Sequence, residues 1–156
     1  MIDDLRIENA TLDDLPQLAE LLHDLFSQEV DFEPNREKQL RGLRLILEQP
    51  SRGRIFVLRS HTRIIGMINL LITISTAEGG FVLLLEDLVI HKDHRGCGYG
   101  TRLLEHAFRF AREKKFLRIT LLTDEPDERA KNFYTRHGFV ESGMVPMRKY
   151  FPSDDA

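Results

Sequence analysis

Residues 87–100 read DLVIHKDHRGCGYG and decide how this 156-residue chain is expected to fold. The first four residues end an apolar run that begins at Phe81, and such a run is typical of a strand covered on both faces. Three glycines follow within five residues, at Gly96, Gly98 and Gly100, before an amphipathic helical pattern starts. The sequence therefore predicts a buried strand that passes through a glycine-rich turn into a helix.

The patterns on either side of this stretch predict a mixture of strands and helices. Residues 5–8 alternate like a short strand, and leucines at helical spacing follow Thr11. Asn35 is placed to cap a second helix, which Pro50 and Gly53 would end. We expect strands over 54–59, 63–74, 81–90 and 117–123, with a helix before the last of them. A further helix would be opened by Pro126 and ended by Gly138. A terminal hairpin would follow from Phe139 and turn near Gly143.

Composition limits the class of protein. The length suits one compact domain over residues 1–156. The 22 Lys and Arg against 25 Asp and Glu give no net positive field for nucleic acid, and no apolar run approaches the ~20 residues of a membrane span. The single cysteine, Cys97, excludes an internal disulfide, and the N-terminus lacks a secretory pattern, so we expect a cytoplasmic protein.

The glycine-rich turn has the properties of an anion site. Glycines let a ligand approach the backbone, a helix start offers free N–H groups, and Arg95 adds a permanent cation. The simpler alternative is a tight strand-to-helix connection with no ligand. A Walker loop would need Gly-Lys-Ser/Thr, and a dinucleotide fingerprint would need glycines spaced Gly-x-Gly-x-x-Gly, and neither pattern is present.

Two segments resemble the GNAT N-acetyltransferase superfamily. Arg95, Gly98 and Gly100 match its coenzyme A pyrophosphate signature, Arg/Gln-x-x-Gly-x-Gly/Ala. Residues 130–139, AKNFYTRHGF, look like its Ala-x-x-Phe-Tyr-x-x-x-Gly-Phe segment. The resemblance implies a GNAT-like α/β (α+β) fold: a mixed, mostly antiparallel central sheet with one parallel strand–helix–strand unit and helices on both faces.

The resemblance also implies a function, the transfer of an acetyl group from acetyl-CoA to a primary amine by direct attack in a ternary complex. The pantetheine arm would pair with the strand backbone, and a backbone N–H of Val89 or Ile90 would stabilise the oxyanion. The cofactor-binding residues implied are Leu88, Val89, Ile90, Arg95, Gly96, Cys97, Gly98, Tyr99, Gly100 and Thr101.

Catalytic groups follow from the same resemblance. Tyr134 stands where family members place a general acid for the departing thiolate, and the alternative is that it only packs its helix against the sheet. Glu86 or Asp87 could accept the amine proton, and similarity to members with a glutamate on this strand favours Glu86. The alternative for either carboxylate is that it pairs with an arginine or holds a strand end. Asp127 replaces the asparagine usual seven residues before the tyrosine, which puts that cofactor contact in doubt.

Other candidates carry weaker signals. His91 and His94 have no further ligands in pattern, so we predict no metal. Cys97 is expected to act as a spacer in the loop. Glu29 and Asp31, with Asp87, could receive a cationic substrate, although such a charge run is usually a solvated face.

The sequence leaves open the identity of the acceptor amine and the oligomeric state. An aminoglycoside, polyamine, amino acid, lysine side chain or protein N-terminus would each fit, and acyl length is not specified. A non-catalytic acyl-CoA sensor of the same fold is the alternative function. A homodimer is a further hypothesis, because the terminal hairpin offers apolar residues: Met144, Val145, Met147, Tyr150 and Phe151.

Overall fold

The computed structural model describes residues 4–27, 34–124 and 126–153. By its internal contacts the chain divides into two compact units, Met1–Leu122 and Thr123–Ala156. Each unit is described by itself below.

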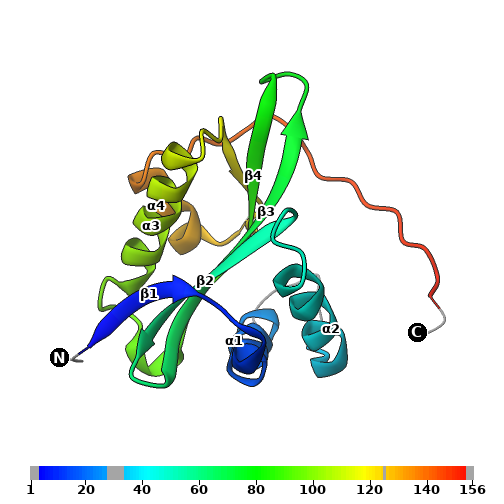
Figure 1. The fold of residues 1–156 in the computed structure, drawn as a ribbon. Coiled ribbons are helices and arrows are strands. Elements are labelled where there is room, and N and C mark those ends of the chain that lie inside the picture. Colours follow the sequence, from blue (N-terminus) through cyan, green and yellow to red (C-terminus); the bar gives the residue numbers. More distant parts are fainter. Residues whose placement is uncertain (1–3, 28–33, 125, 154–156) are drawn as a thin grey trace. The chain divides into compact units, whose positions relative to one another are not determined.

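The first unit is a five-stranded sheet with three α-helices (Figure 1). The strands lie in the order of the chain, each antiparallel to the next except for the parallel pair β4 and β5. This confirms the predicted mixed, mostly antiparallel sheet. The elements are β1 Leu5–Asn9, η1 Leu12–Asp14, α1 Leu15–Phe26, α2 Arg36–Leu47, β2 Gly53–Ser60, β3 Arg63–Ser75, β4 Gly80–Ile90, η2 Lys92–His94, α3 Tyr99–Glu113 and β5 Ile119–Leu121.

Helices cover both faces of this sheet. Phe56 and Val57 are consecutive on β2 and so point to opposite faces. The ring of Phe56 packs at 4.5 Å between centroids on His106 of α3, whereas Val57 belongs to the core cluster under α1. The helix α3 therefore covers one face and α1 and α2 the other, as Figure 1 shows.

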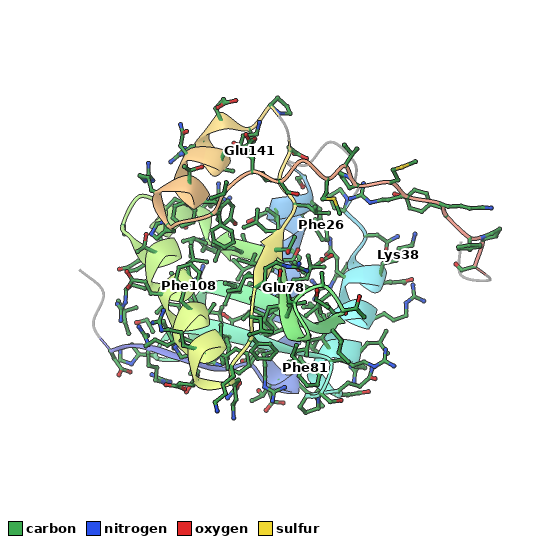
Figure 2. The ribbon with its side chains drawn as sticks, turned by 90° about the horizontal axis from the view of Figure 1, so that it is seen from above. Phe26, Lys38, Glu78, Phe81, Phe108 and Glu141 are labelled. Atoms are coloured by element: carbon green, nitrogen blue, oxygen red, sulfur yellow. The ribbon has the colours of Figure 1, made fainter. Side chains whose placement is uncertain are left out.

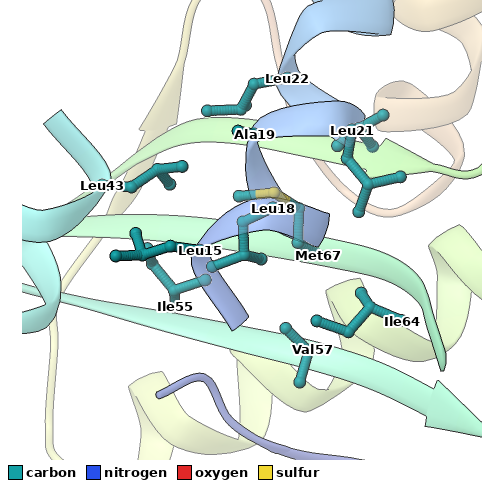
Figure 3. Close-up of a cluster of buried hydrophobic side chains, with 11 residues drawn as sticks. Leu15, Leu18, Ala19, Leu21, Leu22, Leu43, Ile55, Val57, Ile64 and Met67 are labelled. Atoms are coloured by element: carbon teal, nitrogen blue, oxygen red, sulfur yellow. The ribbon is translucent and has the colours of Figure 1, made fainter. Parts of the chain in front are cut away.

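The core beneath α1 and α2 is a cluster of aliphatic side chains. Leu18 and Met67 are fully buried in it, and Leu43 of α2 is almost so (Figure 3). Side chains of this size each contribute about 1.5–3 kcal/mol when they leave water. This layer fixes β3 and β4 against α1 and positions the polar residues that follow Met67 on the same face.

A bidentate ion pair ties β1, β2 and the start of α1 together. Arg59 donates to both carboxylate oxygens of Asp14, at 3.0 and 2.9 Å, and its Nε donates to Glu8 at 2.6 Å. Burial alone would raise the pKa of Asp14, but the hydrogen bonds from Arg59 and from the N–H of Thr11 lower it. Asp14 thus remains ionised although it is buried.

Helix ends mostly follow the sequence signals. The Asn35 side chain accepts from the N–H of Lys38 at 3.1 Å, which confirms the predicted cap of α2. Thr11 instead precedes a short 3₁₀ turn, and the α-helix starts at Leu15. The strand predicted over residues 117–123 is shorter, because only Ile119–Leu121 pairs with β4.

The second unit contains α4, Glu128–Arg136, followed by Gly138 at φ 93°. Gly138 ends the helix as predicted, since a positive φ suits glycine. The predicted terminal hairpin is wrong: no strand occurs between residues 137 and 153. Alternating apolar residues there give a strand-like face, but a strand forms only when a neighbour takes up its hydrogen bonds, and none does so in the part of the chain described.

None of the helices in the described segments combines the length and apolar character that crossing a bilayer requires.

Candidate active site

The end of β4 leaves one edge open. β5 pairs with β4 only at Leu83, Leu84 and Leu85, and it ends at Leu121. On the other edge, β3 stays paired with β4 as far as Ile90. From Glu86 to Ile90, the described part of the first unit therefore offers no strand beside this edge.

The direction of the backbone groups along this edge follows from one hydrogen bond. The N–H of His91 donates to the carbonyl of Ile65 on β3 at 2.7 Å. Because the direction of the backbone groups alternates along a strand, the N–H of Val89 also faces β3, and those of Leu88 and Ile90 face the open edge. Of the two amides expected to stabilise an oxyanion, that of Ile90 faces the open edge.

The glycine-rich loop continues directly from this edge. Gly96 and Gly98 have φ values of 79° and 82°, which L side chains rarely adopt, and no atom lies within 4 Å of a Cβ placed on either. The exposed Arg95 donates from Nε to the carbonyl of Ile90 at 3.1 Å, which places its guanidinium between the strand and the loop. The loop is thus open to a ligand and carries a cation at its entrance.

The start of α3 completes an anion-binding geometry. Gly98 is the N-cap residue and has no side chain to occupy the first amides, and no acidic residue lies in the first turn. The first N–H groups of a helix have no intrahelical partner and favour negative charge. These features fit a pyrophosphate, as coenzyme A would present, and they are formed by the predicted residues Arg95 to Thr101.

A β-bulge in β4 determines which way the side chains of its two acidic residues, Glu86 and Asp87, point. Asn69 pairs with Asp87 and Leu70 pairs with Leu85, so Glu86 is the extra residue. Asn69 and Leu70 are consecutive and face opposite sides of the sheet, so their partners do also. The bulge thereby turns Asp87 toward the α1–α2 layer, while Glu86 is exposed to solvent.

Asp87 is a buried carboxyl that accepts a hydrogen bond from Asn69. It is only 7% exposed, and Asn69 donates from Nδ2 to Asp87 Oδ2 at 2.9 Å. Burial raises the pKa of Asp87 to about 6, in spite of that hydrogen bond, and the nearby charge of Glu86 adds to the rise. Strongly perturbed carboxyls of this kind gather at functional sites.

Two polar residues of this layer, Asn69 and Gln39, were missed by sequence reasoning. Gln39 on α2 is 6% exposed, and neither Nε2 nor Oε1 has a hydrogen-bond partner in the described structure; the same holds for Asn69 Oδ1. The only available signal was the spacing of four residues between Gln39 and Leu43, which places a glutamine on the apolar face of the helix.

An apolar groove of about 910 Å³ lies beside this layer. Leu45 and Ile46 of α2 line one side of it, and Leu71 and Leu84 of the sheet line another. Arg52 is the charged residue among the described lining residues. The groove is open to solvent at the exposed Ile74 and Phe81, the latter labelled in Figure 2.

In the second unit, Tyr134 lies on α4 with its ring 5.5 Å from that of Phe139, edge to face. The backbone carbonyl of Tyr134 also accepts from the amides of His137 and Phe139. Asp127, which replaces the family's asparagine, is the N-cap of α4 and accepts from the N–H of Ala130 at 3.0 Å. Its carboxylate is therefore engaged in starting the helix.

The remaining sequence candidates divide between the described and undescribed residues. Glu29 and Asp31 lie outside the described residues. Cys97 is exposed, and its thiol lies 3.8 Å from the carbonyl of Arg95. His91 and His94 lie 5.7 Å apart between ring centroids, and His91 accepts through Nδ1 from the N–H of Asp93.

Part of this chain is similar to curated acetyltransferases. Over 64 residues it is 39% identical to streptothricin acetyltransferase A of Bacillus subtilis (strain 168), covering 41% of this chain and 37% of that protein. Over 68 residues it is 40% identical to peptidyl-lysine N-acetyltransferase YjaB of Escherichia coli (strain K12), covering 41% and 43%. The chain thus matches about two fifths of the length of these curated relatives.

A solved structure matches over nearly the full length. An aminoglycoside acetyltransferase from an uncultured soil metagenomic sample aligns with a TM-score of 0.73 and 22% identity, covering 96% of this chain and 97% of that one. That likeness supports the fold. The model of the acetyltransferase (GNAT) family matches residues 15–139, a span that holds the open β4 edge, the glycine-rich loop and α4, and the chain belongs to this family.

Proposed function

We propose that this protein is an acetyl-CoA-dependent N-acetyltransferase that acylates a primary amine by direct attack in a ternary complex. The observation that carries this proposal is the continuity of the open β4 edge with the glycine-rich loop. An extended pantetheine arm would pair with the outward backbone groups of Leu88, with its thioester end at the N–H of Ile90. Its pyrophosphate would bind the amides of residues 96–101 and the guanidinium of Arg95.

In the proposed reaction the amine nitrogen attacks the thioester carbonyl carbon, and a C–N bond forms as the C–S bond breaks. The N–H of Ile90, which faces the open edge, would stabilise the oxyanion. Glu86, exposed at the bulge, takes the proton that the amine loses and passes it to solvent. Tyr134 gives a proton to the departing thiolate and regains one from solvent, so that the products are the amide and free coenzyme A.

Further parts of the proposal concern the acceptor and the setting. The relatives are named for action on streptothricin and peptidyl-lysine, and a structural neighbour for aminoglycosides, all of which fit an amine acceptor. We place the protein in the cytoplasm as a single domain without a metal.

A homodimer through the C-terminal apolar residues 144–151 is testable by light scattering, where a monomer at all concentrations would contradict it.

The test is thermal unfolding with and without acetyl-CoA, in the wild type and in Arg95→Ala. Ligand at 100 times its Kd stabilises a protein by about 2.7 kcal/mol, which is several degrees for a domain of this size. We expect this shift in the wild type and a smaller one in the variant. No shift at millimolar acetyl-CoA would contradict the proposal, and an equal shift in both proteins would remove Arg95 from the site.

A non-catalytic acyl-CoA sensor is the alternative function. It predicts the same thermal shift but no release of free coenzyme A thiol with any amine. The two functions are therefore separated by a thiol-release assay with a panel of primary amines.

A further inference from the structure

Three polar side chains lie in one apolar layer of the first unit. Asn69 lies on the same face of β3 as the buried Met67, and Asp87 on the same face of β4 as Val89, since residues two apart on a strand share a face. Gln39 lies on the same face of α2 as Leu43, one helical turn away. Met67, Val89 and Leu43 all belong to the core cluster under α1, so the three polar residues face that layer.

Two of these three residues carry buried polar atoms that lack a hydrogen-bond partner in the described structure. Gln39 Oε1 and Asn69 Oδ1 are buried acceptors without a partner, and Gln39 Nε2 is a buried donor without one. Buried polar atoms are nearly always paired with protein, water or ligand, because an unpaired one lowers stability. Asn69 Oδ1 is carried by the side chain that donates to Asp87, and Gln39 Oε1 faces the same layer from α2. Free acceptors that share a layer with a buried carboxylate suit a group that carries several N–H donors and a positive charge, as a primary ammonium does.

The apolar groove adjoins this polar layer. Leu71 follows Asn69 at the next position on the same face of β3, and Leu84 is its partner on β4. Both line the groove, together with Ile46, which lies one turn beyond Leu43 on α2. A molecule lying in the groove would therefore have its inner end beside Asn69 and Asp87.

The charge of the groove favours one class of molecule. Its described lining includes the cation Arg52 and no carboxylate, so a second positive charge on the ligand would be unpaired and repelled there. Aliphatic walls at Leu45, Leu71 and Leu84 would instead bury a hydrocarbon or aromatic body.

We propose that the acceptor is a primary amine with a single charge and an apolar body, its ammonium held by Asp87, Asn69 and Gln39 and its body lying in the groove between α2 and the β3–β4 hairpin. This inference rests on the proposed function, in that the bound ammonium would become the nucleophile after it has given up a proton to solvent. Asp87, Asn69 and Gln39 are assigned to binding and positioning, and Gly42 and Leu84 to the choice of substrate.

Binding to the ¹⁵N-labelled full chain tests the proposal without any need for turnover. In NMR spectra, we expect 2-phenylethylamine to shift the side-chain amide resonances of Gln39 and Asn69 until they saturate. The backbone amide resonance of Leu84 should shift with them. Spermidine should move them at least tenfold more weakly. The proposal would be overturned if neither amine moved the two side-chain signals, as when water fills the site, or if spermidine moved them as strongly.

Gly42→Leu tests the groove with a variant that should fold well. Gly42 lies within α2 and lines the groove, and an added Cβ would have no atom within 4 Å apart from its chain neighbours and the nearby backbone of its own helix. Leucine is the better helix former, so the Tm should not fall. We expect binding of 2-phenylethylamine to weaken at least tenfold while ethylamine, which lacks the long body, binds as before. Equal effects on both amines, or none on either, would contradict the assignment.

Gln39→Met tests the polar layer. Removal of two unpartnered buried polar atoms should raise the Tm by a few degrees, whereas amine binding should weaken at least tenfold. A lower Tm with unchanged amine binding would show a structural role and overturn the assignment of Gln39. Lys38→Met is the control: Lys38 is the exposed neighbour at the periphery of α2 (Figure 2), and neither quantity should change.

These outcomes are separable from failure of the proposed function. Loss of the acetyl-CoA-induced thermal shift tests the loop after β4, whereas the amine signals of Gln39 and Asn69 test the other layer. Amine binding without acetyl-CoA binding would retain this inference as a ligand site and reject the acetyltransferase.

Discussion

Asn69 and Asp87 lie opposite each other on β3 and β4 and share a buried hydrogen bond of 2.9 Å from Asn69 Nδ2 to Asp87 Oδ2. The bulge at Glu86 places Asp87 there, in a layer otherwise occupied by aliphatic side chains. A carboxylate held in such a layer with a single amide donor is costly when ionised, and this makes the stability of the protein depend on pH.

Asp87→Asn should change that dependence. Burial and the charge of Glu86 raise the pKa of Asp87 from 3.8 to about 6. A raised carboxyl pKa means that the stability is fully present below pH ~4 and is lost as pH rises through ~6. We expect the variant to match the wild type near pH 4 and to exceed it by up to about 3 kcal/mol at pH 8, in urea unfolding. Parallel stability curves would contradict this.

Arg59→Met should destabilise the protein strongly. Arg59 forms the bidentate pair with Asp14, and its loss leaves a buried carboxylate without its cation. Breaking a buried pair from one side costs about 3–5 kcal/mol. The control is Arg44→Met, which removes an exposed pair with Glu48 at 3.8 Å and should cost less than about 1 kcal/mol. If urea unfolding gave similar losses of unfolding free energy in the two variants, the buried pair would contribute no more to stability than the exposed one.

Gly98→Ala should weaken both the fold and cofactor binding. The φ of 82° at this N-cap position costs an L residue about 1–2 kcal/mol. A relaxed backbone would also turn the first amides of α3 away from a bound phosphate, so the Kd for acetyl-CoA should rise. Gly42→Ala, inside α2, should instead stabilise the protein by about 0.5–1 kcal/mol and leave that Kd unchanged. Calorimetric titration measures Kd, and an unchanged value for Gly98→Ala would remove the loop from the site.

Tyr134→Phe separates catalysis from binding. If Tyr134 protonates the thiolate, kcat should fall by about 100-fold or more while the Kd for acetyl-CoA is unchanged. Tyr150→Phe is the matched control in the same unit, because Tyr150 is 74% exposed. Free thiol release measures kcat. Equal rates in wild type and Tyr134→Phe would reject the acid role, and a lower Tm in the variant would point to packing against Phe139.

The sequence predicted most of the first unit because its signals are local. Asn35 caps α2 through its own side chain, and the apolar run from Phe81 marks β4 whatever its neighbours are. The loop from Arg95 to Gly100 was predicted from the spacing of its glycines and from its resemblance to a family signature, and both are local features of the sequence.

The parts that were missed depend on pairing across the chain. The bulge at Glu86 is a matter of register between β3 and β4, and simple alternation along β4 does not contain it. The hydrogen bond from Asn69 to Asp87 follows from that register. The hairpin predicted from Phe139 failed for the same reason, since an alternating pattern specifies a face and not a partner.

An open strand edge also carries a hazard. Unpaired N–H and C=O groups on a sheet edge can pair with any other extended chain and so promote aggregation. At the end of β4 the exposed segment is short, and the carbonyl of Ile90 is already engaged by Arg95. Arg95 would then act as a gatekeeper against stray strands as well as a phosphate ligand, and its loss should make the protein more prone to self-association in the absence of acetyl-CoA.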